Sequence, residues 1–286
     1  MERRLILPLI SCFIAWAALT GCPADDDDFH TGDDDAGDDD TGDDDTGDDD
    51  TGDDDTGDDD TGDDDDSVSS CNDWDPIDVP GAQWVYSSNY NITYQDQLMS
   101  DSGVETVQAG GSTYFQGFTV YQRTGSFAGA QYQVSWWGYD NCEAGGNVDY
   151  GSYVTDSQAQ ATVLTVNSDP VMYLPYNPDQ QMGYSWTSSY NQQVDLSIEG
   201  SGTYPCTWNW TVVGMESVSV PAGTFNNAIH ISATYQTQDP AGSHSGTLDT
   251  YWVKGLGLVK WDEQRPSEGG TYILRELQSY SGLTPQ

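Results

Sequence analysis

Residues 207–233 have the sequence TWNWTVVGMESVSVPAGTFNNAIHISA, which carries the clearest structural pattern in the chain. In its first half, large apolar side chains occupy every second position: Trp208, Trp210 and Val212. The same period returns in its second half at Phe225, Asn227, Ile229, Ile231 and Ala233. Between the halves, Pro221 and Gly223 fit the second and fourth positions of a type I turn that starts at Val220. A period of two places alternate side chains on one face of a strand, so the segment predicts a β-hairpin.

Alternation of the same kind continues through residues 67–286. The residues that share a face are Trp84 with Tyr86; Tyr90 with Ile92 and Tyr94; Tyr132 with Val134 and Trp136; Val194 with Leu196 and Ile198; and Leu248 with Thr250 and Trp252. Turn-forming residues predict chain reversals at Asp101-Ser102-Gly103, Ala109-Gly110-Gly111, Ala144-Gly145-Gly146-Asn147, Asn177-Pro178-Asp179 and Asp239-Pro240-Ala241-Gly242. Proline cannot donate to a strand ladder, so we expect strand ends at Pro80, Pro175, Pro205 and Pro221. The spacing predicts an all-β fold of about a dozen antiparallel strands in a curved sheet, a sandwich or a barrel.

The charge of the chain is strongly acidic and unevenly distributed. The formal net charge of the 286 residues is -41, and residues 22–66 hold 26 Asp with no Lys or Arg. Residues 67–286 hold 21 acidic and 5 basic side chains. A nucleic-acid partner requires a basic surface, which this composition excludes. We therefore divide the chain into residues 1–21, an acidic linker at 22–66 and a β domain at 67–286.

The first 21 residues have the pattern of a signal peptide, with a charged start, an apolar run and small residues at the end. The segment Leu19-Thr20-Gly21-Cys22 resembles a bacterial lipobox. The resemblance implies cleavage before Cys22, a diacylglyceryl group on its thiol and acylation of the new amine, which together anchor the protein in a membrane. Pro23, rather than the Asp linked to inner-membrane retention, follows Cys22 and favours the outer membrane. The alternative is an uncleaved transmembrane helix over residues 5–24, against which Pro8 argues.

Residues 22–66 consist mostly of TGDDD repeats and contain almost no apolar side chain. Such a segment cannot offset the entropy lost on ordering, so we expect a disordered spacer that its own charge extends. The repeats lack the ligand order of an EF-hand, and we expect weak association with divalent cations. Acidic residues directly after a lipidated cysteine resemble the surface-export signals of some Gram-negative lipoproteins. The sequence does not decide whether the domain is exposed to the periplasm or at the cell surface.

Two motifs in the β domain resemble a signature of bacterial lipoproteins related to half-barrel lipoprotein carriers. They are VPAGTF at residues 220–225 and GLGLVK at residues 255–260. The resemblance covers about two thirds of the domain. It implies a curved antiparallel sheet, half-barrel or barrel-like, that can enclose a lipid tail.

Three cysteines lie in the β domain: Cys71, Cys142 and Cys206. Export places them in an oxidising compartment, so we expect one structural disulfide from one of the three possible pairs. Their spacing fits neither a redox motif nor a zinc ribbon.

The sequence predicts no catalytic residue, no cofactor and no metal centre, because it contains no HExxH, P-loop or S-x-x-K motif. His230 alternates with Ile229 and Ile231, which predicts the polar face of a strand, whereas His244 lies within Gly242-Ser243-His244-Ser245-Gly246, which predicts a turn. One segment is rich in oxygen ligands that suit Ca²⁺, although we favour a solvated polar loop there. Its residues are Asp140, Asn141, Glu143, Asn147 and Asp149.

Together these features predict a non-enzymatic, lipid-anchored protein of the bacterial cell envelope. Its β domain contains 9 Trp and 18 Tyr, which we expect mainly in the core. The domain would bind a hydrophobic small molecule or serve an envelope-structural role. The alternatives are a surface module that binds glycans or mediates adhesion, for which aromatic rings are also suited, and a glycoside hydrolase, for which the domain has enough carboxylates.

Overall fold

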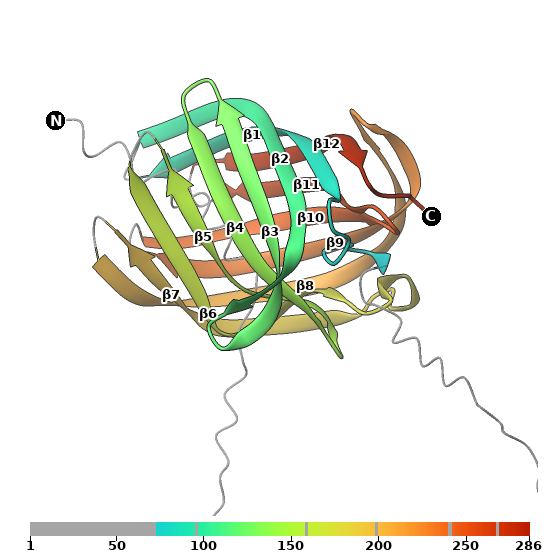
Figure 1. The fold of residues 1–286 in the computed structure, drawn as a ribbon, viewed down its shortest axis with the longest axis horizontal. Coiled ribbons are helices and arrows are strands. Elements are labelled where there is room, and N and C mark those ends of the chain that lie inside the picture. Colours follow the sequence, from blue (N-terminus) through green and yellow to red (C-terminus); the bar gives the residue numbers. More distant parts are fainter. Residues whose placement is uncertain (1–72, 95–96, 158–159, 198–199, 240–241, 267–268) are drawn as a thin grey trace, which may run out of the picture. The chain divides into compact units, whose positions relative to one another are not determined.

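The computed structural model describes residues 73–94, 97–157, 160–197, 200–239, 242–266 and 269–286. The predicted signal peptide, Cys22, the TGDDD repeats, Cys71 and Ile198 lie outside the described residues. In these ranges the chain forms twelve antiparallel strands and a short 3-10 helix, η2 (Figure 1). Their bounds are β1 Gln83–Tyr94, β2 Gln97–Phe115, β3 Phe118–Gly129, β4 Gln133–Glu143, β5 Gly146–Asp156, β6 Ala161–Pro175, η2 Pro178–Gln180, β7 Ser185–Leu196, β8 Gly200–Val220, β9 Gly223–Asp239, β10 Gly242–Val253, β11 Gly257–Arg265 and β12 Thr271–Ser281.

The strands close into a barrel. Each strand pairs with the next along the chain, and β1 also pairs with β12, from Gln83 opposite Ser281 to Asn91 opposite Tyr272. Within the described residues, this last pairing leaves the sheet without a terminal edge strand, which removes a site of edge-to-edge aggregation. The prediction of an antiparallel, barrel-like sheet of about a dozen strands is confirmed, and the half-barrel alternative is wrong because β1 and β12 meet.

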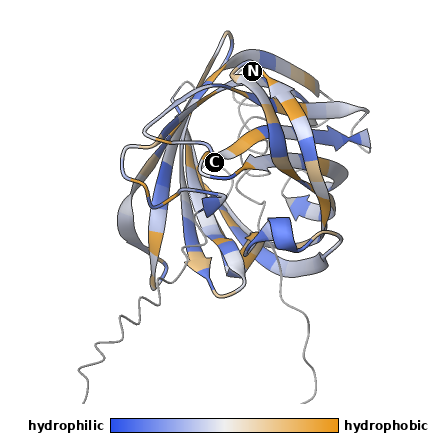
Figure 2. Cartoon of the chain, turned by 90° about the vertical axis from the view of Figure 1, so that its right-hand side faces the viewer, coloured by the Kyte–Doolittle hydropathy of each residue, from blue (hydrophilic) through white to orange (hydrophobic). Residues whose placement is uncertain are grey.

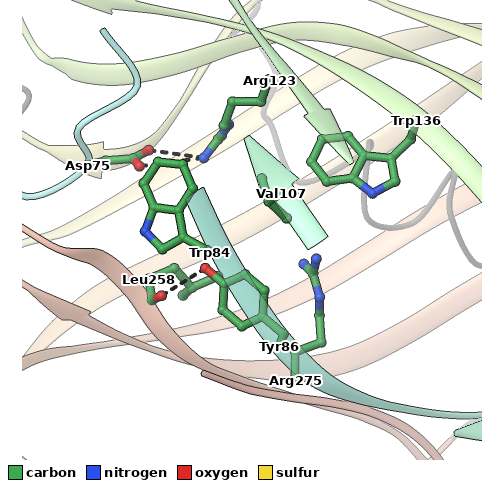
Figure 3. Close-up of a pocket in the computed structure, with 8 residues that line it drawn as sticks. All are labelled: Asp75, Trp84, Tyr86, Val107, Arg123, Trp136, Leu258 and Arg275. Atoms are coloured by element: carbon green, nitrogen blue, oxygen red, sulfur yellow. Dashed lines mark hydrogen bonds and ion pairs between the residues drawn. The ribbon is translucent and has the colours of Figure 1, made fainter. Parts of the chain in front are cut away.

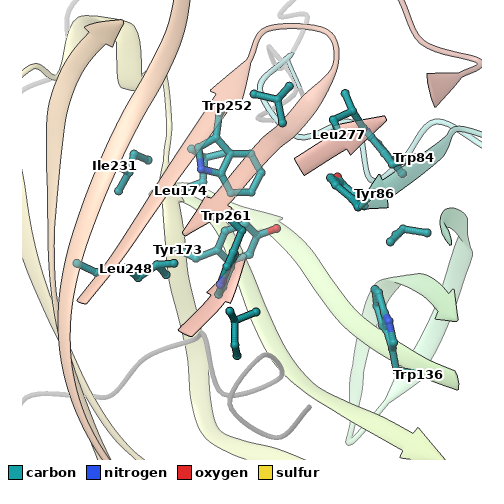
Figure 4. Packing of buried hydrophobic residues seen from close by; sticks show 14 of the residues in the cluster. Trp84, Tyr86, Trp136, Tyr173, Leu174, Ile231, Leu248, Trp252, Trp261 and Leu277 are labelled. Atoms are coloured by element: carbon teal, nitrogen blue, oxygen red, sulfur yellow. The ribbon is translucent and has the colours of Figure 1, made fainter. Parts of the chain in front are cut away.

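The period-two pattern decides which side chains fill the barrel. Figure 2 shows hydrophobic and hydrophilic residues interleaved along the strands. The predicted faces are buried at Trp84 and Tyr86; Tyr90 and Ile92; Val134 and Trp136; Trp208, Trp210 and Val212; Ile229, Ile231 and Ala233; and Leu248, Thr250 and Trp252. Seven of the nine tryptophans of the domain are buried, which agrees with the expectation that aromatic side chains mainly fill the core (Figure 4).

The predicted hairpin is present between β8 and β9, where Pro221 and Ala222 form the turn. Register shifts between Val212 and Gly214 and between Glu216 and Val218 interrupt the pairing of the two strands. Such bulges bend a strand pair. The backbone N–H of Ala222 donates to the carbonyl oxygen of Leu277 on β12 at 2.8 Å. The tip of this hairpin therefore folds across one end of the barrel.

Residues 73–82 occupy the same end of the barrel as the start of β1. Trp74, Asp75 and Ile77 are buried, and the carbonyl oxygen of Asp73 accepts a hydrogen bond from Gly255 in the turn between β10 and β11. The end of the chain lies close by, since the backbone N–H of Gln286 donates to the carbonyl oxygen of Lys254. The segment that follows the acidic linker is thus part of the folded core.

Two predicted turns are wrong, because both lie within β2. The backbone of Gly103 passes Ala128 so closely that a Cβ atom would lie 2.3 Å from its carbonyl oxygen. Asp101 accepts hydrogen bonds from the backbone N–H groups of Ala130, Gln131 and Tyr132, and so caps the neighbouring turn. The glycines of Ala109-Gly110-Gly111 mark a bulge, where the register with β3 shifts.

Pro205 departs from the expected strand end and lies inside β8, opposite Asn191 of β7. The pairing of β8 with β9 begins one residue later, at Cys206 opposite Thr237. Within the described residues, β8 therefore has a neighbour on one side at this position. A missing N–H group is tolerated at such an edge.

Candidate functional site

A buried ion pair joins β2 to β12 inside the barrel. Arg275 donates through Nε to Oε2 of Glu105 at 2.7 Å, and its Nη2 also contacts Oε1. Glu105 accepts three further hydrogen bonds, from Ser88, Tyr90 and the indole Nε1 of Trp136. Arg275 is 1% exposed and Glu105 is 0% exposed. The network satisfies both charges, which is the condition for burying them without a large loss of stability.

A second network ties the N-terminal segment to the barrel wall. Arg123 on β3 binds both carboxylate oxygens of Asp140 on β4 at 2.8 Å. Its Nη1 lies 3.3 Å from Oδ2 of Asp75, which also accepts a hydrogen bond from the hydroxyl of Tyr173 at 2.7 Å. The bidentate pair fixes the guanidinium, and Asp75 then anchors residues 73–82 to it.

The two networks line one small cavity (Figure 3). Its volume is about 30 Å³, and the guanidinium groups of Arg123 and Arg275 reach it beside Asp75, Trp84 and Tyr86. One water molecule needs roughly 10–15 Å³ of such volume, so the cavity has room for one or two. It has no room for an acyl chain.

The charges around this cavity do not balance, because Asp75, Asp140 and Glu105 face two guanidinium groups. Burial raises the pKa of Asp140, and the neighbouring charge of Asp75 adds to this effect, whereas Arg123 opposes it. The network thereby favours a proton on Asp140 at a pH where an exposed aspartate is ionised.

A third ion pair lies on β11, where Nε of Arg265 donates to Oε1 of Glu263 at 2.7 Å. The hydroxyl of Tyr235 donates to the same oxygen at 2.5 Å. The three arginines of the β domain therefore all bind carboxylates that are buried. The basic side chains on the exterior of the described residues are Lys254 and Lys260, and they pair with Asp73 and Asp262.

The three candidate cysteines have different surroundings. Cys142 is disulfide-bonded. Cys206 is a buried thiol whose Sγ lies 3.8 Å from the carbonyl oxygen of Tyr204. Cys71 lies outside the described residues.

The oxygen-rich segment does not form the solvated loop that we favoured, because most of it belongs to β4 and β5. Asp140 faces the interior and pairs with Arg123, and Glu143 accepts the hydroxyl of Tyr150 at 2.5 Å. Asp149 accepts a hydrogen bond from Asn167 at 2.9 Å. These oxygens point to separate partners, and no cluster of His, Cys, Asp or Glu within the described ranges is arranged to hold a metal ion. None of the helical turns in those ranges could cross a bilayer.

His230 lies on the outer face of β9, as predicted, between two carboxylates. Its Nδ1 is 3.0 Å from Glu216 on β8, and its Nε2 is 2.8 Å from Asp249 on β10. The ring of Tyr251 stacks on it at 4.6 Å, and Lys260 on β11 lies over that ring. The turn expected at His244 is wrong, because β10 begins at Gly242 and includes this residue.

We expect the stability of the protein to fall as pH rises above neutrality, through His230. Burial alone would lower the pKa of His230, but its bonds to Asp249 and Glu216 outweigh this and raise it. A histidine whose pKa is raised by folding contributes stability that is fully present below about pH 6.5, the pKa in the unfolded chain. This contribution is lost as the pH rises through the pKa in the folded protein. The carboxylates are partly exposed, so the contribution is about 1 kcal/mol or less.

Thermal unfolding of wild type and His230→Gln measures this effect. The variant should melt about 2 °C lower at pH 6 and equally at pH 9. An equal loss from His230→Gln at both pH values would show that the imidazolium does not contribute.

The outer face of β8, β9 and β10 carries two hollows that adjoin. Their volumes are about 380 and about 320 Å³, and Thr207, Gln236 and Ser245 line both. Register places these three side chains opposite one another across the strands. A second row, directly beside the first, consists of Asn209, Thr234 and Thr247. We call this surface the β8–β10 groove.

Two solved structures resemble the barrel. One is assigned as an exported protein with a YmcC-like fold from Bacteroides fragilis, at 10% identity and a TM-score of 0.40 over 71% of this chain and 97% of that chain. The other is assigned as a lipoprotein from Parabacteroides distasonis, at 13% identity and a TM-score of 0.40 over 71% of this chain and 95% of that chain. No protein family and no curated protein matches the sequence. At this TM-score the likenesses carry no functional assignment.

Sequence reasoning missed the buried ion pairs and the groove. The sequence did contain a signal for a buried ion pair, because Arg275 falls on the same face of the alternating pattern as Ile273 and Leu277, both of which are buried. A charged residue at an inward position of an alternating run indicates a partner inside the barrel. The groove has no comparable signal, because polar residues on an outer face are ordinary.

Proposed function

We propose that the chain is a non-enzymatic lipoprotein of the bacterial cell envelope that is anchored in the outer membrane and works through the outer surface of its barrel. Anchoring follows from the lipobox, and the acidic repeats act as the spacer between lipid and barrel. The observation that carries the proposal is the described cavity between Arg123 and Arg275, which has a volume of about 30 Å³ and lies among aromatic rings and the two ion-pair networks. A lipid carrier needs an apolar cavity of some hundreds of Å³.

The arrangement of the carboxylates favours a binding role over glycoside hydrolysis. Asp75 and Asp140 are both 2% exposed and both engage Arg123, so a polysaccharide cannot reach them. On the exterior, Glu216 and Asp249 are held by His230, which lies between them. A hydrolase requires two accessible carboxylates that face one glycosidic bond.

Mass spectrometry of the full-length protein, extracted from its own envelope, tests the proposal. We expect a covalent mass that corresponds to a chain beginning at a triacylated Cys22, and the same mass under native and denaturing conditions. Cys22→Ser should remain unprocessed and lose its lipid. A lipid-sized mass that is present only under native conditions would overturn the proposal and support a carrier. Processing and membrane retention of Cys22→Ser would overturn the predicted anchor.

A further inference from the structure

We propose that the β8–β10 groove binds a neutral polysaccharide. The inference rests on the proposed function, because it names the partner of the barrel's outer surface. It starts from the chemistry of the groove's lining. The two hollows are lined mostly by hydroxyl and amide side chains. Gly246 and Pro266 complete the lining of one, and Pro205 and His244 that of the other; none of the lining residues is Asp, Glu, Lys or Arg.

The groove is hollow because its floor is made of small residues. Gly246 lines one of the two hollows and presents only its backbone there. Ser245 and Thr247 flank the glycine with short side chains. Gln236 forms the longer wall on β9.

Several side chains of the groove have hydrogen-bonding groups that no other described residue engages. Asn209 lines the groove, and its Oδ1 accepts the hydroxyl of Thr187 on β7 at 2.9 Å, so its amide nitrogen is the group left to donate to a ligand. The side chains of Thr234, Gln236 and Thr247 make no hydrogen bond to other described residues and are exposed. Neighbouring strands lie about 4.8 Å apart, so these donors and acceptors form a regular array.

The composition of the groove excludes other classes of partner. The large exposed apolar side chains of the described residues lie elsewhere, among them Tyr114, Phe118 and Met215. A protein interface is expected to bury aromatic or arginine side chains, and a lipid surface requires an apolar or basic face. Anionic polymers are repelled by a domain with 21 acidic and 5 basic residues. A neutral chain rich in hydroxyl groups fits, because each hydroxyl both donates and accepts.

Affinity electrophoresis of the full-length protein in gels that contain dextran, galactomannan or alginate tests the inference. The detergent must lack a sugar headgroup, since it would compete for the groove. We expect at least one neutral polysaccharide to retard the protein and alginate to have no effect. Gln236→Glu places a charge in the groove without changing the shape of the side chain, and it should weaken retardation at least tenfold.

The matched control is Gln193→Glu, an exposed position on β7 that lines neither hollow. It carries the same change in charge and should bind as wild type does. The inference fails if no neutral polysaccharide retards the protein, if alginate does so equally, or if the two variants bind alike. Lipid analysis of the same preparation distinguishes a failure of the proposed function from a failure of this inference. A non-covalently bound lipid would contradict the proposed function, whether or not the groove binds a polysaccharide.

Discussion

Replacing Arg275 with Met should lower the free energy of unfolding by about 3–5 kcal/mol, because it leaves the buried carboxylate of Glu105 without its counter-ion. Both side chains are at most 1% exposed, so water cannot take the place of the lost partner. For a domain of this size, the melting temperature should fall by roughly 10 °C. Thermal unfolding followed by circular dichroism measures the change.

Two further variants separate the ion pair from the bulk of the side chain. The double variant Glu105→Leu with Arg275→Met removes both charges, and it should recover much of the lost stability because buried ion pairs are often replaced by apolar residues at little cost. Lys254→Met is the control, since Lys254 pairs with Asp73 near the surface and should contribute less than about 1 kcal/mol. Equal losses from Arg275→Met and Lys254→Met would contradict the argument.

The sequence alone predicts the strands of the barrel and their buried faces far better than it predicts the closure of the barrel and its interior ion pairs. Trp208, Trp210 and Val212 face inward because a strand with one buried face tolerates only one register of apolar residues. Closure by β1 and β12 was not predictable in the same way. It joins residues almost 200 positions apart, such as Gln83 and Ser281, and no local pattern specifies that pairing.

The partners within the interior polar networks are the part that the sequence could not provide. Arginine is usually found at the surface, so a composition argument places Arg123 and Arg275 outside. Their positions depend on carboxylates supplied by other strands, and Asp75 reaches Arg123 from outside the strands altogether. For the same reason the oxygen-rich segment was mistaken for a loop: Asp140 is buried because Arg123 on β3 offers it a bidentate partner.

Gly125→Ala should destabilise the barrel by about 3 kcal/mol, because the added methyl group has no space. Gly125 on β3 lies directly opposite Trp136 on β4, and the indole covers it. A Cβ atom at Gly125 would lie 2.0–2.3 Å from three atoms of that ring. The ring cannot move aside freely, since Trp136 is 1% exposed and donates to Glu105 at 3.0 Å.

A double-mutant cycle with Trp136→Leu tests this explanation. In the background of the smaller side chain, Gly125→Ala should cost less than about 1 kcal/mol, so that the two substitutions are strongly coupled. Gly111→Ala on β2 is the matched control, because a Cβ atom there meets no atom within 4 Å and the change should be nearly neutral. If Gly125→Ala costs the same with either residue at position 136, the cost arises from the backbone of β3 rather than from the ring. If the coupling is found, the glycine and the indole act as one unit, and this unit holds the Glu105–Arg275 pair in place through the indole N–H group.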